Sequence, residues 1–316
     1  MTDVLVLGGG IVGLNTALRL ASETDHKVTV WSANYLENTS SYSGAYWWPP
    51  PSDLEGEQPP AWALETLEFF QSLGTYAGIT FRKLIALMEE PWEFPNWFSK
   101  IPNFREALKH ELNAPFKQGL IIDPGPVIDP PAHLKWLREQ LSHLDVEIET
   151  RQVSSLEEPL EQYSILVNCT GIGARELCND TDLRPVSGQL VKIRTSNANQ
   201  VTATGNLPVR TTYIIPHTTY TSLGGTYFEN DWQTEPDENE TKMIIERCNK
   251  LCPTLQATES DIIAITRGLR PVRSSVRVET EKRAKGVIIH NYGHGKSGFS
   301  LAFGSAGAAV RLINEL

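Results

Sequence analysis

Long hydrophobic runs are absent from this sequence. No stretch of about 18 consecutive apolar residues occurs in the 316-residue chain, so no segment is a candidate for a membrane-spanning helix. After Met1, Thr2 and Asp3 the chain enters an apolar run at once, which leaves no room for a signal peptide. The last three residues are not the usual peroxisomal address. We therefore expect a cytoplasmic protein with no membrane partner.

Positively charged residues are also fewer than negatively charged residues. The chain has 28 Lys and Arg residues against 38 Asp and Glu residues, which gives a formal net charge of −10 at pH 7. A nucleic-acid-binding protein needs a basic surface for the phosphate backbone, so we expect no nucleic-acid partner. A small anionic substrate is not excluded, because one pocket can be basic while the whole chain is acidic.

Cysteine is scarce, and its spacing is uninformative. The chain has 4 cysteines, at positions 169, 178, 248 and 252. Cys248 and Cys252 are four residues apart on a predicted helix, but no second Cys or His pair stands at the spacing of metal ligands. Cytosolic proteins rarely carry disulfides. We expect free, structural thiols and no metal site.

The sequence does contain a regular alternation of predicted strands and helices. With 40% hydrophobic and 21% charged residues it is typical of a soluble globular protein, and its length suits two domains. The hydrophobic periodicity and the residues that interrupt helices and strands predict strands at 4–7, 27–31, 146–149, 165–168, 188–193, 213–215, 220–223, 262–267 and 286–291. They predict helices at 11–22, 62–73, 131–144, 238–250 and 298–316, and an irregular, Pro- and Trp-rich cap at 80–130.

The first turn has the glycine spacing of a dinucleotide-binding site. Gly8, Gly10 and Gly13 form G-x-G-x-x-G directly after an apolar strand, and Ile11 and Val12 open an amphipathic helix. The first glycine permits the tight turn, the second lets a pyrophosphate approach the backbone, and the third allows close packing of helix on strand. The helix N-terminus then binds the anion.

One element of the NAD fingerprint is missing. An acidic residue that binds the ribose hydroxyls is expected after the second strand, near 32–34, but these positions hold Ser32, Ala33 and Asn34. A polar side chain such as that of Ser32, or the backbone, must take its place. The sequence therefore favours FAD over NAD.

Five further segments resemble the D-amino acid oxidase and D-aspartate oxidase family. Together with the N-terminus they cover most of the chain and follow the family's order: NTSSYSGAYWWP at 38–49, VNCTG at 167–171, YIIP at 213–216, GLRPVR at 268–273 and HNYGHG at 290–295. Five motifs in order are far more specific than any one of them. The resemblance implies a Rossmann-like FAD-binding domain at 1–46, 130–190 and 265–316. A substrate domain on a mixed, largely antiparallel sheet would occupy 47–129 and 191–264.

The resemblance also implies which residues bind FAD. The segment at 38–47 would wrap the flavin, the main chain at Val153 would meet the adenine, and the last helix would point its N-terminus at the flavin pyrimidine. The complete set is Gly8, Gly10, Ile11, Val12, Gly13, Ser32, Thr39, Ser40, Gly44, Ala45, Val153, Thr170, Gly171, Arg270, Gly295, Lys296, Ser297, Gly298, Phe299 and Ser300.

The same resemblance implies a site for an amino-acid carboxylate. Arg270 would bind it with its planar fork and Tyr213 would add a hydrogen bond. The implied catalytic residues are Tyr213, Arg270 and Lys296, with Tyr46, Trp48 and Ile215 as further substrate contacts. The expected reaction is oxidative deamination of a D-amino acid to a 2-oxo acid and ammonia. Hydride would pass to flavin N5, and reoxidation by dioxygen would give hydrogen peroxide.

Several residues depart from the family pattern. The family's second pocket tyrosine corresponds to Val209, which implies a more open lid, while Trp48 and Tyr46 are larger than usual and would narrow the pocket. Lys296 replaces a small residue whose carbonyl binds the substrate amine. Its ammonium group would favour an acidic substrate, activate dioxygen at the flavin or reach solvent. Arg210 is a further candidate for binding a side-chain carboxylate.

Three alternatives stay open at this point. One is an oxidase for D-aspartate or D-glutamate, or for glycine and N-methyl amines. Another is a flavin dehydrogenase that uses a different electron acceptor. The third is a non-catalytic FAD-binding protein, which Arg270 and Tyr213 argue against. A homodimer is common in the resembling family, so a dimer is also an expectation.

Overall fold

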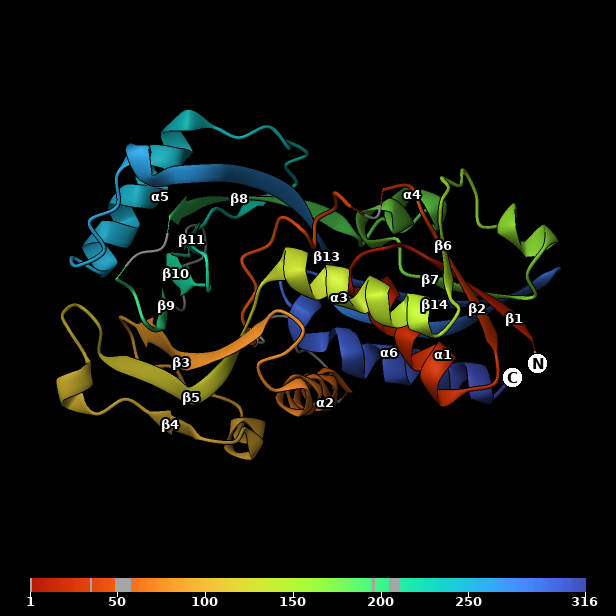
Figure 1. Cartoon of the computed structure of the whole chain (residues 1–316), viewed down its shortest axis with the longest axis horizontal. Helices are drawn as coiled ribbons and strands as arrows, with labels where there is room; N and C mark the ends of the chain where they lie inside the picture. Colours follow the sequence, from red (N-terminus) through yellow and green to blue (C-terminus); the bar gives the residue numbers. More distant parts are fainter. Residues whose placement is uncertain (1, 35, 49–57, 195–196, 205–210) are drawn as a thin grey trace.

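A single large sheet runs through the molecule (Figure 1). The computed structural model describes residues 2–34, 36–48, 58–194, 197–204 and 211–316. Within them the sheet has 14 strands in the order β4-β5-β3-β9-β10-β11-β8-β13-β14-β7-β1-β2-β6, with β12 paired to β8. None of the described helices is both long and apolar enough to cross a membrane. The sheet divides into a parallel end and an antiparallel end.

The parallel end is the Rossmann-like part that the sequence predicts. It contains the strands β1 (Asp3–Leu7), β2 (Lys27–Ser32), β6 (Glu147–Thr150), β7 (Ile165–Asn168) and β14 (Gly286–His294), and each neighbouring pair is parallel. The interior strands are buried on both faces, which explains why they read as continuous apolar runs rather than as an alternating pattern.

Helices cover this parallel end. They are α1 (Ile11–Glu23), α3 (Pro130–His143) and α6 (Gly298–Asn314), and α2 (Gln58–Leu73) packs beside α6 (Figure 1). Asp129 caps α3 by accepting a hydrogen bond from the Ala132 N–H, and two prolines occupy its first turn, where no N–H donor is needed. Gly304 allows the close approach of α2, because a Cβ there would overlap the backbone of Trp62.

The antiparallel end contains the predicted strands at 188–193, 213–215 and 220–223 and two strands, β9 and β12, that were not predicted. It includes β8 (Arg184–Arg194), β9 (Val201–Thr204), β10 (Tyr213–Pro216), β11 (Tyr220–Gly224) and β12 (Phe228–Glu229), with α5 (Glu238–Leu251) packed on one face. The fold prediction, an α/β protein with a Rossmann-like part and a mixed, largely antiparallel sheet, is confirmed. The exact domain boundaries remain a prediction.

One strand joins the two ends. β13 (Ile262–Arg283) pairs with β8 over its first half and with β14 over its second half. It is much longer than the predicted strand at 262–267, because its charged and half-buried residues hide the continuation beyond residue 267. Arg270 lies on the part of β13 that pairs with β8, shortly before the strand passes to β14.

The prediction of an irregular cap at 80–130 was wrong. The segment contains β3 (Ile79–Met88), β4 (Phe104–Glu106) and β5 (Gln118–Ile128), which extend the sheet past β9. Pro124 and Pro126 suggested a loop, but they lie beside a register shift between Arg82 and Leu84 where the strand pairing is interrupted. Prolines are tolerated in strands at such irregularities.

The remaining elements are short. The helix α4 (Ala174–Leu177) follows β7, and 3₁₀ turns lie at Asn96–Lys100, Lys109–Glu111, Pro159–Glu161, Gly171–Gly173 and Glu259–Asp261. The other predicted helices and strands are found, with ends that shift by a few residues.

Candidate active site

In the glycine turn after β1, side chains at two of the positions would overlap neighbouring backbone. Gly8 has a φ of 119°, a conformation that favours glycine, and a Cβ there would overlap the Cys169 carbonyl. A Cβ at Gly13 would overlap the Gly8 carbonyl, so α1 packs directly on the turn. Gly10 is the N-cap of α1 and has no side-chain cap. The backbone of this turn is therefore open to an anion at the helix N-terminus.

The segment at 38–48 lies against this turn. The Ile11 N–H donates to Ser40 Oγ at 3.0 Å, and the Asn38 side-chain oxygen accepts from the Ser40 N–H at 3.0 Å. Ser43 Oγ donates to the Ser40 carbonyl at 2.8 Å. Hydroxyl groups thus fix the segment to the start of α1, next to the position predicted for a pyrophosphate.

Contacts with β13 fix the other side of the segment. Thr39 donates to the Leu269 carbonyl at 3.0 Å, and Thr266 donates to the Tyr42 carbonyl at 3.1 Å. His217 lies behind the segment, fully buried beside Gly44, with its Nε2 3.2 Å from Ser222 Oγ. Burial lowers the pKa of His217 to about 3, so the ring is neutral near pH 7. Sequence reasoning missed His217.

Residues predicted to meet the adenine gather at the ends of β2 and β6. The Arg151 N–H donates to the Ser32 carbonyl at 2.9 Å, and Val153 packs against the core cluster that contains Trp31. The Arg151 guanidinium lies 3.7 Å from the centroid of the Trp31 ring, so this contact closes the region from one side. Arg151 was not among the predicted residues.

The motif at Thr170 and Gly171 ends β7 on the same edge of the sheet. The side-chain oxygen of Asn168 accepts two hydrogen bonds from Thr170. One comes from the Thr170 backbone N–H at 3.2 Å and the other from the Thr170 hydroxyl at 2.7 Å. Gly171 has a φ of 57°, which a side chain would strain, and it faces the ring of Pro271. These contacts hold the turn in place at the end of β7.

The last helix begins at the same place. The Gly295 N–H donates to the Pro271 carbonyl at 2.9 Å, Ser297 is the N-cap, and Gly298 is the first residue of α6. Phe299 and Ser300 line the adjoining cavity, and Ser300 Oγ accepts the Trp48 N–H at 3.2 Å. The partial positive charge at the N-terminus of α6 is thereby directed at this cavity.

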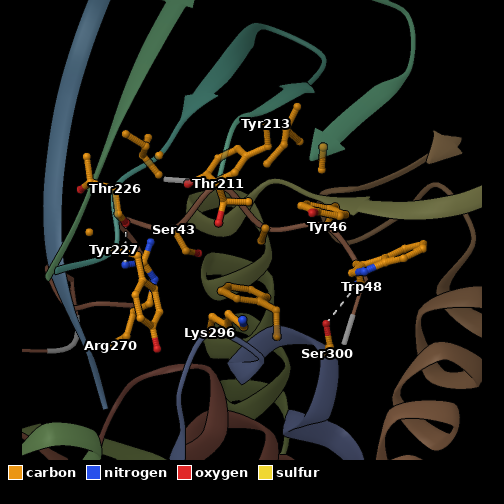
Figure 2. Close-up of a pocket in the computed structure, with 18 of the residues that line it drawn as sticks. Ser43, Tyr46, Trp48, Thr211, Tyr213, Thr226, Tyr227, Arg270, Lys296 and Ser300 are labelled. Atoms are coloured by element: carbon orange, nitrogen blue, oxygen red, sulfur yellow. Dashed lines mark hydrogen bonds between the residues drawn. The ribbon is translucent and has the colours of Figure 1, made fainter. Parts of the chain in front are cut away.

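A cavity of about 790 Å³ lies between the two ends of the sheet. Figure 2 shows Arg270 and Trp48 on opposite sides, Tyr213 above, and Lys296 and Ser300 below. The predicted residues that line it are Thr39, Gly44, Ala45, Tyr46, Trp48, Tyr213, Ile215, Arg270, Lys296, Phe299 and Ser300. The structure thus brings the predicted substrate residues together with part of the predicted flavin contacts.

The other predicted cofactor residues lie outside the lining of this cavity. They are Gly8, Gly10, Ile11, Val12, Gly13, Ser32, Ser40, Val153, Thr170, Gly171, Gly295, Ser297 and Gly298. Ser40 links the two groups, because it contacts Ile11 while the neighbouring Thr39 lines the cavity. Val209 and Arg210 lie outside the described residues, so the predictions on the lid and on Arg210 stay predictions.

One glycine, Gly188, makes room for the guanidinium of Arg270. Gly188 on β8 faces Gly268 on β13, and a Cβ at Gly188 would overlap the Arg270 guanidinium. One end of that guanidinium donates to the Thr226 carbonyl at 3.1 Å, drawn as a dashed line in Figure 2. Arg270 is therefore laid flat along the strands and keeps further N–H donors for a ligand. Sequence reasoning missed Gly188.

Tyr213 depends on glycines in a similar way. Its ring lies across Gly224, the residue opposite on β11, and a Cβ at Gly225 would come within 2.7 Å of the hydroxyl oxygen. Burial raises the pKa of Tyr213, and the positive charge of Arg270 only partly offsets this. Tyr213 is therefore protonated at neutral pH and can donate its O–H.

The opposite wall of the cavity is mainly apolar. It is formed by Tyr46 and Trp48 with Met88, Trp92 and Leu120 of the β3–β5 region. Burial raises the pKa of Tyr46, and the nearby Tyr213 adds to the rise, so this phenol also stays protonated. Sequence reasoning missed the contribution of β3 and β5, because it placed no strands there.

The cysteines have no site of their own. All 4 are free; Cys169 and Cys248 are buried, and burial raises the pKa of each thiol to about 12. In the part of the chain that the structure describes, no group of three or more His, Cys, Asp or Glu residues is arranged to hold a metal ion.

The comparison with known families gives a clear result. Residues 3–312 match the family described as DAO, FAD dependent oxidoreductase. The chain belongs to this family. The D-amino-acid oxidase of Streptomyces coelicolor is 37% identical over 322 residues, covering 99% of this chain and 97% of the relative. Human D-aspartate oxidase is 30% identical, covering 99% and 94%.

A solved structure confirms the likeness of fold. Glycine oxidase from Geobacillus kaustophilus superposes with a TM-score of 0.81 at 16% identity, covering 100% of this chain and 95% of that one. At this identity the likeness concerns the fold alone. Family membership makes FAD the cofactor, and the predicted resemblance is confirmed.

The residues present fit FAD. Gly8 and Gly13 let the turn and α1 pack directly on neighbouring backbone, Gly10 places no side chain at the start of α1, and the hydroxyl-rich segment around Ser40 lies beside it. The neighbouring cavity is large enough for a ring system and a small ligand together. No acidic residue stands at the ribose position, as the sequence indicated.

Proposed function

We propose that the protein is an FAD-dependent oxidase that deaminates a D-amino acid to a 2-oxo acid and ammonia. One observation carries the proposal. The Arg270 guanidinium opens into the same cavity as Thr39, Ala45 and the start of α6, which are predicted flavin contacts. A carboxylate held by Arg270 would therefore place an amino acid beside the flavin.

The chain's own residues would mainly orient the substrate. FAD supplies the redox chemistry when bound, taking a hydride from the substrate α-carbon and passing the electrons to dioxygen to give hydrogen peroxide. Arg270 would bind the carboxylate through two N–H groups, and the protonated Tyr213 would donate its O–H to the same group. Fixing the substrate in this way supplies much of the rate enhancement.

No side chain is proposed as a general base. The only carboxylate among the described residues that line the cavity is Glu229, which is exposed at the end of β12. The substrate would therefore react with its amine already deprotonated. The carbonyl of Lys296 would accept a hydrogen bond from that amine, while Tyr46, Trp48 and Ile215 would contact the side chain.

The D-configuration follows from the relatives. The relatives named D-amino-acid oxidase and D-aspartate oxidase match almost the whole chain at 37% and 30% identity. The apolar wall with Trp48 and Met88 favours an apolar side chain over that of D-aspartate or D-glutamate. Glycine, N-methyl amines and a dehydrogenase reaction are the competing possibilities. A cytoplasmic location and a homodimer remain predictions.

Product analysis tests this proposal. The purified yellow protein is incubated in air with D-amino acids, the matching L-amino acids, glycine and sarcosine, and peroxide, ammonia and 2-oxo acid are measured. We expect all three products in equal amounts from D-amino acids alone. Products from only sarcosine or L-amino acids would contradict the substrate. Reduction without peroxide would identify a dehydrogenase instead.

A further inference from the structure

Two cations enter the cavity from different parts of the chain and share one aromatic ring. Arg270 comes from β13, and Lys296 comes from the loop that precedes α6. The Arg270 guanidinium and the Lys296 ammonium each lie 5.8 Å from the centroid of the Tyr227 ring. Figure 2 shows Arg270 and Tyr227 at the left of the pocket and Lys296 below its centre. Tyr227 was not among the residues predicted from the sequence.

The charges at this place run against the charge of the whole protein. Apart from tyrosines, the described ionisable residues that line the cavity are Arg270, Lys296 and Glu229, in a chain of net charge −10. Glu229 is exposed, so it is screened by water more than the two cations are. The face of Tyr227 attracts each cation, but the two positive charges repel one another. An anion bound between them would remove that repulsion.

We propose that Lys296 is a second carboxylate-binding residue, and that its ammonium group and the Arg270 guanidinium bind the same carboxylate of the substrate. The ring of Tyr227 positions both cations. The inference rests on the proposed function, because it takes the substrate to be an amino acid. It assigns a role to the Lys296 side chain, whereas the family resemblance concerns only its carbonyl.

The arrangement of charged and apolar residues in the cavity indicates whether the α-carboxylate or a side-chain carboxylate of the substrate is bound. Arg270 lies on the opposite side of the cavity from Trp48, which forms an apolar wall with Met88 and Trp92, and Lys296 lies below them. A dicarboxylic substrate would direct its second carboxylate into this apolar wall, where burial of an unpaired charge is costly. The pair of cations therefore serves the α-carboxylate, and the side chain is apolar.

The test compares two ligands that differ only in charge. Benzoate carries a carboxylate, and benzamide is its uncharged amide of similar shape. Binding of each to the FAD-loaded protein is followed through the change in the flavin absorption spectrum, which requires no turnover. The variants are Lys296→Met, Lys296→Arg, Tyr227→Phe and Tyr227→Leu. Lys242→Met, an exposed lysine on α5, is the matched control.

The two lysine variants should distinguish the effect of the positive charge at residue 296 from a general change in the shape of the pocket. For Lys296→Met we expect the Kd of benzoate to rise about tenfold, the size of a lost hydrogen bond to a charged group. The Kd of benzamide should stay within about a factor of two, as should both Kd values of Lys242→Met. Lys296→Arg should recover most of the benzoate affinity, because it keeps the charge.

The tyrosine variants test the shared ring. Tyr227→Phe keeps the aromatic face and should bind benzoate like the wild type. Tyr227→Leu should lose part of the benzoate affinity and little of the benzamide affinity, because the ring face that holds both cations is gone.

Three results would overturn the inference. One is unchanged benzoate binding in Lys296→Met. Another is an equal loss for benzoate and benzamide, which would mean that the change disturbs the pocket in general. The third is unchanged benzoate binding with slower flavin reoxidation, which would assign Lys296 to dioxygen. If Lys296→Met loses benzoate affinity as expected but the wild type oxidises no D-amino acid, the proposed function fails and the role of Lys296 in binding a carboxylate stands.

Discussion

The two ends of the sheet hold their ligands in different ways. At the parallel end, the contacts predicted for FAD are glycines, backbone groups and hydroxyls at the ends of buried strands, with Gly8 and Gly13 as examples. At the antiparallel end, the contacts for the substrate are large side chains such as Arg270 and Tyr213. Each of these lies on a glycine of the neighbouring strand. Glycines thus allow close packing of the backbone turn in one region and position side chains in the other.

The difference implies that the two functions can be damaged separately. A change in the glycine turn should remove FAD and with it all activity. A change at the Arg270 side should leave FAD bound and affect only the substrate. The following predictions run from the largest expected effect to the smallest.

Gly13→Ala should abolish FAD binding. Its Cβ would overlap the Gly8 carbonyl, so α1 could pack on the turn only by moving. The purified variant should be colourless and inactive, with a circular dichroism spectrum that still shows helix and strand. Gly10→Ala is the milder companion, because its Cβ would lie 3.1 Å from Ser40 Oγ, a side-chain atom that can shift. A fully yellow Gly13→Ala protein would contradict the assignment of the cradle.

Arg270→Leu should leave FAD bound and remove catalysis. Loss of one partner of a buried charge pair costs about 2–5 kcal/mol, so kcat/KM should fall by a factor between about 30 and about 5000. The ratio of absorbance at the flavin band to that at the protein band measures FAD content, and steady-state assays measure kcat/KM. A kcat/KM equal to that of the wild type, or loss of FAD together with activity, would contradict the separation of cofactor binding from substrate binding between the two regions.

Gly188→Ala should weaken substrate binding without touching the substrate. A Cβ at residue 188 would overlap the Arg270 guanidinium, which must then move away from the Thr226 carbonyl. We expect the KM to rise about tenfold, which is the effect expected when a hydrogen bond to a charged group is misplaced. Gly268→Ala is the matched control on the facing strand, since its Cβ would find only contacts of 3.8 Å. Equal effects from both variants would argue against the role of Gly188.

Buried histidines should make the protein less stable in acid. Burial lowers the pKa of His217 and of His294 to about 3, below the ordinary value, so the unfolded chain binds protons first as the pH falls. Between about pH 6.5 and 3 each residue should lower the free energy of unfolding by up to about 1.4 kcal/mol per pH unit. Urea unfolding measured at several pH values tests this. His217→Asn should flatten the slope, and an unchanged slope would exclude His217 as its source.

The sequence predicts the parallel end better than the antiparallel end, for a physical reason. The glycine turn at Gly8 to Gly13 and the apolar strands are local patterns, because the backbone conformation depends on neighbouring residues. The clearance for Arg270 depends on Gly188, which is 82 residues away and meets it only across the sheet. Nothing in the local sequence marks this pair.

The same reasoning explains the missed strands. β3 and β5 become part of the sheet through pairing with β9 and with each other, and their prolines lie at a pairing irregularity. The residues they contribute to the cavity, Met88 and Leu120, could therefore not be assigned from the sequence. Tyr227 was missed too, because its function depends on cations from two distant segments.

The most direct test of the account is an anaerobic comparison of enantiomers. The purified FAD-loaded protein is mixed without oxygen with D-phenylalanine, with L-phenylalanine and with D-aspartate, and loss of the visible absorbance of the oxidised flavin is recorded. The account predicts rapid bleaching by D-phenylalanine, slow bleaching by D-aspartate and none by L-phenylalanine. Bleaching by L-phenylalanine alone, or by none of the three, would contradict it.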